Sequence, residues 1–156
     1  YTIVYDDSNK EDEQWYINTN QSYAFANSTV TATYGSATAR AHADANFTEE
    51  DEDNGLGTEG ELKSRGLKYN LIKTVKSEAA GELTKTDWYI TRNAEKSTAI
   101  PSAITTHRDL VRSRQATMET QITNASNTPA LETLYTYTKD SDGVTSRPLA
   151  EIPTLD

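Results

Sequence analysis

Two short runs at the start of the chain, residues 1–5 (YTIVY) and residues 13–19 (EQWYINT), are rich in β-branched and aromatic residues. Such runs are typical of strands, and the stretch between them, DDSNKED, consists of turn-forming polar residues. The pattern predicts a hairpin, with residues 28–34 (STVTATY) as a third strand. A small antiparallel β module is therefore expected at this end.

The pattern changes at Gly35. Residues 36–47 (SATARAHADANF) are rich in alanine and predict a short helix capped by Ser36. Residues 48–57 (TEEDEDNGLG) combine acidic residues, Asn and two glycines, which predicts a loop.

Apolar positions in the second half recur with a helical period. Thr58 and Glu61 have the spacing of a capping box, and the apolar residues that follow share one helical face up to Gly81: Leu62, Tyr69, Ile72 and Ala79. Pro101 is expected at the first position of a second helix, whose stripe repeats at seven, seven and four residues: Ile104, Val111, Met118 and Ile122. The two helices are predicted to pair through these stripes.

Thr128 and Pro129 predict the start of a third, short helix through ALETLYTY, and residues 141–156 lack a helical period. Two prolines in this last segment predict an extended arm. Its apolar residues should dock on the helical hairpin or on another subunit, which makes the segment a candidate partner-binding arm: Val144, Pro148, Leu149, Ile152, Pro153 and Leu155.

The sequence thus predicts an α+β protein with an acidic β-rich module (residues 1–57), a helical hairpin domain (58–140) and a C-terminal arm (141–156). Its net charge of −9 lies in the first module, which contains eleven acidic residues and only two basic residues, Lys10 and Arg40. Such a module repels phosphate backbones, so nucleic acid is not an expected partner. No apolar run is long enough for a membrane span. The chain has no cysteine, so disulfides and thiolate sites are excluded.

The acidic loop resembles a calcium-binding loop in spacing. Glu50, Glu52, Asn54, Thr58 and Glu61 fall at positions one, three, five, nine and twelve of that pattern. The first position should be Asp, however, and Gly57 stands where an apolar residue is usual. A solvated acidic loop explains the same residues, so the segment is kept only as a weak metal candidate.

No motif of an enzyme is present. His42 and His107 are not in a metal-ligand spacing and are expected to be ordinary surface or interface residues, and no nucleophile elbow or phosphate loop occurs. The sequence predicts neither catalytic activity nor a cofactor.

The segment TKTDWYITRNAEKSTAIPSAITTHRDLVRSR predicts a structural clasp formed by Asp87, Trp88, Pro101, Arg108 and Arg112. Arg108 and Arg112 are four residues apart and share a helix face. Asp87 on the incoming connection is expected to reach that face, and Trp88 to be buried over the seam between the two helices.

A helix, a (S/T)DW segment and a proline-started helix with R..(V/L)R resemble small tail-associated proteins of tailed bacteriophages. That group includes tail-fibre assembly and tail-assembly-chaperone-like domains. TDWYITR, IPSAITTHRDLVR and METQITNA closely resemble the version of marine contractile-tailed phages, over roughly residues 60–125. Where many relatives carry an aromatic residue before the first Arg, this chain has His107.

The resemblance implies a non-enzymatic role in the virion, with assembly in the host cytoplasm. The expected function is a structural part of the tail, baseplate or fibre attachment, with other phage structural proteins such as tail-fibre or baseplate subunits as partners. The alternative is a transient tail or tail-fibre assembly chaperone; a calcium-binding interaction module is a third reading. Homo-oligomerisation within the particle stays open.

Overall fold

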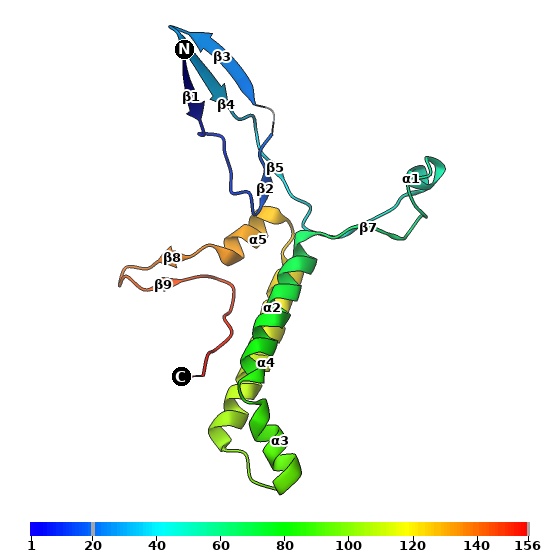
Figure 1. Cartoon of the computed structure of the whole chain (residues 1–156), viewed down its shortest axis with the longest axis vertical. Helices are drawn as coiled ribbons and strands as arrows, with labels where there is room; N and C mark the ends of the chain where they lie inside the picture. The colour runs from blue at the N-terminus through cyan, green and yellow to red at the C-terminus, as the bar shows by residue number, and fades with distance from the viewer. Residues whose placement is uncertain (20, 156) are drawn as a thin grey trace.

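The computed structural model describes residues 1–19 and 21–155 and has the predicted α+β class. Separate arms extend from a central junction (Figure 1). They are an N-terminal sheet, a stalk that carries α1, the α2–α4 helical pair and a C-terminal hairpin. The protein exposes 10428 Å², whereas a compact monomer of this mass exposes roughly 7,800 Å². The elements are therefore spread out rather than gathered around one core.

The N-terminal sheet consists of β1 (Thr2–Asp6), β3 (Ser22–Ala26) and β4 (Thr29–Thr33) in the order β1-β4-β3. The predicted hairpin of residues 1–5 with residues 13–19 is wrong, because β1 pairs in parallel with β4. The hairpin is β3–β4. Asn27 and Ser28 connect these strands with φ of 50° and 62°, and two positive φ values give the turn whose twist matches paired strands.

The short strand β2 (Tyr16–Ile17) pairs with β5 (Thr38–Ala39), so the helix predicted for residues 36–47 is wrong. Alanine favours helix only weakly, and pairing with β2 overrides it. The Arg40 amide donates to the Trp15 carbonyl at 2.8 Å next to this ladder. Strand pairing thus brings Trp15 to the helical part of the molecule.

A second two-stranded ladder, β6 (Ala45–Asn46) with β7 (Leu62–Ser64), forms the stalk that carries α1 (Glu49–Asp53). The loop predicted for residues 48–57 therefore contains a short helix. Its capping box is Thr48 with Asp51, whose side chains each accept from the other's backbone amide. The predicted box of Thr58 and Glu61 is wrong, and Leu62 lies in a strand.

Helix α2 (Leu67–Thr84) begins directly after Gly66. A Cβ at Gly66 would lie 2.3 Å from the Ala43 backbone, so only glycine lets the stalk and the helix meet this closely. Along α2, Val75 and Ala79 are buried, Ile72 is partly buried, and Tyr69 is exposed. The predicted stripe is thus right at Ile72 and Ala79 and wrong at Tyr69.

Helix α4 (Ser102–Asn124) runs back along α2 (Figure 1), and its whole predicted stripe is buried. Pro101 is the residue before the helix, with φ of −55° and ψ of 136°, rather than its first residue. Among the described residues, no helix has the length and apolar character that a membrane crossing requires.

Two further helices complete the fold. Helix α3 (Asp87–Lys96) was not predicted, because DWYITRNAEK was interpreted as a connection. Helix α5 (Thr128–Tyr135) confirms the third predicted helix, although Asn127 caps it by accepting from the Ala130 amide. The strands β8 (Thr138–Lys139) and β9 (Thr145–Ser146) form a hairpin before the last residues.

The largest cluster of buried hydrophobic residues lies where these elements meet. Trp15 from the predicted acidic module and Leu149 from the predicted arm join helical residues in it: Val75, Met118, Ile122, Ala125 and Leu131. Trp15 packs on Tyr135 with ring centroids 5.5 Å apart. The same packing thus links all three predicted segments.

Candidate interaction site

Arg108 holds the corner between α2 and α3 against α4. Its Nη1 donates to the Leu83 carbonyl at 2.8 Å, to Thr86 Oγ1 at 2.7 Å and to Asp87 Oδ1 at 2.9 Å. The carbonyl lies in the last turn of α2, where helix carbonyls lack partners within the helix. Asp87 opens α3, where the helix dipole favours a negative charge. One guanidinium therefore satisfies the end of one helix and the start of the next.

The predicted contact of Asp87 with Arg108 is present, but the other parts of the clasp differ. Arg112 is exposed and pairs with Asp109 of its own helix at 3.3 Å, so it does not hold the corner. Trp88 is 50% exposed, and its predicted burial over the helix seam is wrong. The reason is that Trp88 belongs to a helix, which turns its ring away from the seam.

A partly exposed aromatic patch lies on α3 at the far end of the helical pair, with Trp88 exposed and Tyr89 and Arg92 partly buried. The Trp88 and Tyr89 rings lie 3.8 Å apart, and the Arg92 guanidinium lies 4.7 Å from the Trp88 ring. Ile90 is also exposed. We call Trp88, Tyr89, Ile90 and Arg92 the hairpin tip.

Glu82 connects α2, α4 and the C-terminal segment. Its carboxylate contacts His107 Nε2 at 3.1 Å and accepts from the Leu155 amide at 2.8 Å. The hydrogen bond from Lys85, followed by that from Leu155, lowers the pKa of the Glu82 carboxyl below its ordinary value. His107 is buried, so of its two predicted places, at the surface or at an interface, the first is wrong.

The C-terminal segment docks on its own chain. Leu149 is fully buried, its amide donates to the Leu134 carbonyl, and Gln121 bonds the backbone on both sides of it, at Pro148 and Ala150. Ile152 and Pro153 are half-buried, whereas Pro148, Val144 and Leu155 are exposed. Leu149 was predicted to dock either on the helical hairpin or on another subunit, and the structure shows the first. Residue 156 lies outside the described part.

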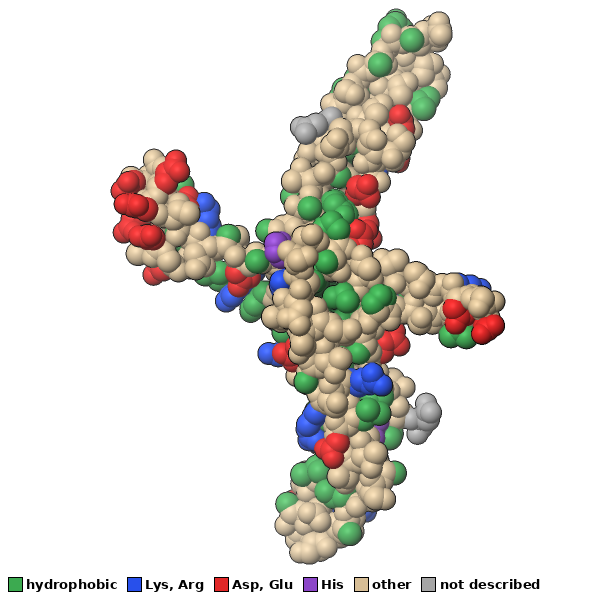
Figure 2. All heavy atoms as spheres, turned by 180° about the vertical axis from the view of Figure 1, so that it is seen from behind, with side chains coloured by type: hydrophobic (Ala, Val, Ile, Leu, Met, Phe, Trp, Pro, Cys, Tyr) green, Lys and Arg blue, Asp and Glu red, His purple; other side chains and the backbone are tan. Residues whose placement is uncertain are grey.

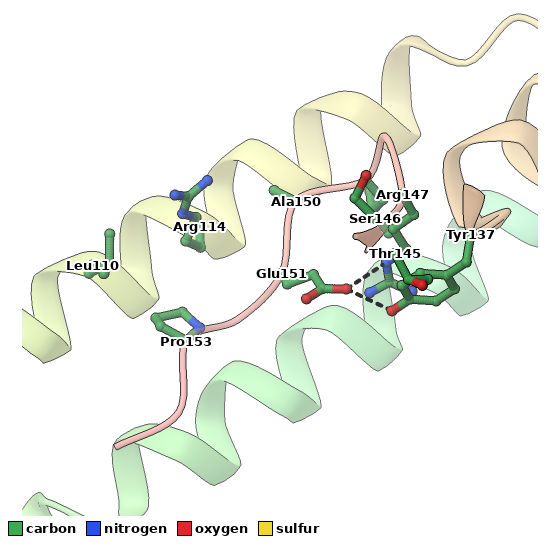
Figure 3. A pocket seen from close by; sticks show the side chains of 10 residues that line it. Leu110, Arg114, Tyr137, Thr145, Ser146, Arg147, Ala150, Glu151 and Pro153 are labelled. Carbon is green, nitrogen blue, oxygen red and sulfur yellow. Dashed lines mark hydrogen bonds and ion pairs between the residues drawn. The ribbon is translucent and has the colours of Figure 1, made fainter. Parts of the chain in front are cut away.

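Arg147 fixes the segment where it leaves the β8–β9 hairpin. Its guanidinium lies over the rings of Tyr135 and Tyr137, and Glu151 accepts from the Tyr137 hydroxyl at 2.6 Å and pairs with Arg147 at 3.4 Å. An open groove of about 580 Å³ runs between these residues and α4. Figure 3 shows Glu151 facing Arg147 and Tyr137, with Leu110 and Arg114 on α4. Glu151 thus links Tyr137 and Arg147, although the buried Arg147 Nε has no hydrogen-bond partner among the described residues.

The calcium-loop candidates do not converge. Glu50 and Glu52 lie in α1, and the Glu52 carboxylate accepts from the Glu59 amide at 2.9 Å. Asn54 donates to the Glu50 carbonyl, while Thr58 and Glu61 lie on the return to β7. Within residues 1–19 and 21–155, no three or more His, Asp or Glu side chains gather as a metal site would need.

A further surface, which the sequence reasoning missed, lies on the N-terminal sheet. Directly paired residues point to the same side of a sheet, so the register places one set of residues on a common apolar face: Ile3, Tyr5, Tyr23, Phe25, Val30 and Ala32. Tyr1 packs edge-on against Phe25. We call this set the apolar sheet face. The alternation in SYAFA and STVTATY, separated by two turn residues, was the signal that could have revealed it.

The charged side chains lie away from the apolar sheet face. Residues 1–5 and 21–39 contain no charged side chain, whereas every residue of α1 is acidic. Figure 2 shows acidic side chains gathered at the α1 end of the stalk and hydrophobic side chains reaching the surface of the sheet.

Comparison with protein-family models, with curated proteins and with solved structures finds no match to this chain. The resemblance to phage tail-associated proteins therefore stays a prediction from the residues quoted above.

Proposed function

We propose that this chain is a non-enzymatic structural subunit of a tailed-bacteriophage particle, placed in the tail, the baseplate or a fibre attachment. One observation carries the proposal: the surface of 10428 Å² is about a third larger than that of a compact protein of this mass. Such a surface is typical of a chain that is completed by neighbouring proteins.

The places of the exposed apolar groups support the same function. The apolar sheet face and the hairpin tip lie at opposite ends of the molecule, with the α2–α4 pair between them (Figure 1). Exposed apolar patches of this kind mark protein contacts. The helical pair acts as a spacer, and Arg108 keeps the tip at a fixed angle to it.

The order of DW, proline and arginine supports the phage origin through the family resemblance. In this chain Asp87 and Arg108 of that pattern meet at the corner, and the helix that begins at Asp87 presents Trp88 to solvent. A surface-exposed tryptophan is suited to contact a partner, because aromatic residues are enriched at protein interfaces.

Immuno-electron microscopy of phage particles tests this function. A short epitope inserted at Gly55, in the turn after α1, should label purified particles at one place on the tail, because no neighbouring atom lies within 4 Å of a Cβ there. Label that is confined to unassembled tail or fibre proteins would instead support the assembly chaperone. Label on neither would refute both functions.

A further inference from the structure

The N-terminal sheet presents a large apolar face to solvent. Ile3, Tyr5, Tyr23 and Phe25 are 63–68% exposed, and Tyr1 is 97% exposed. Aromatic side chains carry roughly 150–250 Å² each, so these residues leave on the order of 600–700 Å² of side-chain surface uncovered. A stable interface buries about 800 Å² on each partner. The face is thus close to the size of one complete interface.

The shape of the face suits a second sheet. The edge strands β1 and β3 carry the large side chains, with Tyr5 and Tyr23 in one cross-strand row and Ile3 and Phe25 in the next. The central strand β4 carries Val30 and Ala32 between them, and Ala32 is only 2% exposed, so no open valley separates the two edges at this position. A broad apolar face of this kind can pack against another sheet face to face.

The charge distribution favours the same occupant. The chain has a net charge of −9 that lies within residues 1–57, and two copies that met through the acidic α1 would bring like charges together. The sheet is the exception, because residues 1–5 and 21–39 are uncharged. This face has no charged group that could recognise a partner of opposite charge. An uncharged, aromatic-rich patch is instead the composition of homo-oligomer interfaces, which are more apolar than other interfaces.

From size, shape and charge together, we propose that the apolar sheet face is covered by the same face of another copy of this chain. The sheets stack with their apolar faces inward and their threonine-rich faces outward, and the stalk and helical pair project from the assembly. This inference does not depend on the phage function, because it rests on the sheet alone.

Sedimentation velocity with two matched variants of the full chain tests the inference. Phe25→Glu and Ala24→Glu add the same charge to adjacent positions of β3, but Phe25 points to the apolar face and Ala24 to the opposite one. Both positions are exposed, so both variants should fold, which circular dichroism checks. The wild type and Ala24→Glu should sediment as oligomers at about 100 µM, because interfaces of this size have micromolar or tighter affinities. Phe25→Glu should dissociate at least about tenfold more readily.

Mixing identifies the occupant. Phe25→Glu and Phe25→Lys should each be mainly monomeric, and an equal mixture should recover oligomers that contain both chains, because opposite charges then meet across the interface. A monomeric wild type at the same concentration would overturn the inference and point to a different protein as the occupant. Equal weakening by Phe25→Glu and Ala24→Glu would also overturn it. Either result leaves the test of the phage function unaffected.

Discussion

Arg108 of α4 and Asp87 of α3 lie 2.9 Å apart, although 21 residues separate them in the chain. The same Arg108 nitrogen also bonds Leu83 and Thr86, so one side chain joins three helices. Arg108 is buried, and Thr86 has no exposed surface. The Arg108 guanidinium therefore holds the corner together with the bonds from Thr86 to the Leu83 carbonyl.

We expect Arg108→Ala to lower the free energy of unfolding by about 2–4 kcal/mol, because it removes a buried guanidinium together with its bonds to Leu83, Thr86 and Asp87. Arg108→Lys should recover only part of this, since an ammonium cannot reproduce the planar fork. Arg112→Ala, one turn further along the same helix, should change stability by less than about 0.5 kcal/mol. Urea unfolding measures the stability of all three variants. Equal losses of stability in Arg108→Ala and Arg112→Ala would contradict the role of Arg108 at the corner.

Trp88→Ala should cost about 1 kcal/mol of stability, far less than the 3–5 kcal/mol of a buried tryptophan, because half of the side chain is already in water. If the hairpin tip contacts a neighbour in the particle, the same change should reduce incorporation into particles while the purified chain remains folded. Thermal unfolding and a quantitative immunoblot of particles provide the two measurements. A large loss of stability would mean that Trp88 is buried after all.

Leu149→Ala should lower stability by about 2–5 kcal/mol, because Leu149 is fully buried among residues of the central core. Leu155→Ala is the control within the same segment. Its side chain is 39% exposed, so the change should cost only about 1 kcal/mol. Similar effects at both leucines in chemical denaturation would show that the segment does not dock as described.

Acid should weaken the bonds that Glu82 accepts from Lys85 and from the Leu155 amide of the C-terminal segment. Its pKa is lowered in the folded state, so the stabilisation is present above the ordinary value of 4.5 and is lost as pH falls through the lowered value. Glu82→Gln should therefore lose less stability than the wild type between pH 7 and about pH 3. Glu78→Gln, an exposed position one turn earlier, should keep the wild-type dependence. Denaturant unfolding at several pH values measures the difference, and parallel curves for wild type and Glu82→Gln would contradict the role of this carboxylate.

The helical part of the fold could be predicted further than the β part. The stripe from Ile104 to Ile122 was readable because a long amphipathic helix repeats its pattern over several turns. The N-terminal pairing was not, because β1 joins β4 across a long connection and nothing local encodes a non-local parallel partner. The alanines at every second position from Ala37 to Ala45 favour a helix by composition. Their actual strand partners, β2 and β7, are also distant in the sequence.

The candidate site was predictable in its charges but not in its exposure. Asp87 and Arg108 could be matched as an acid and a base brought together at one helix face. The exposure of Trp88 depends on α3, whose start at Asp87 looked like a connection between helices. The apolar sheet face was hidden because its rows come from three strands whose partners were not known.

The most direct test of the account is the absolute amount of this chain in gradient-purified phage particles, measured by mass spectrometry against isotope-labelled peptides. A structural subunit should be present at a fixed ratio to the major tail protein, and the ratio should survive repeated purification and washing with salt. A ratio that falls toward zero with purification, while the chain stays abundant in the infected cell, would contradict the central claim that this protein is a permanent part of the particle.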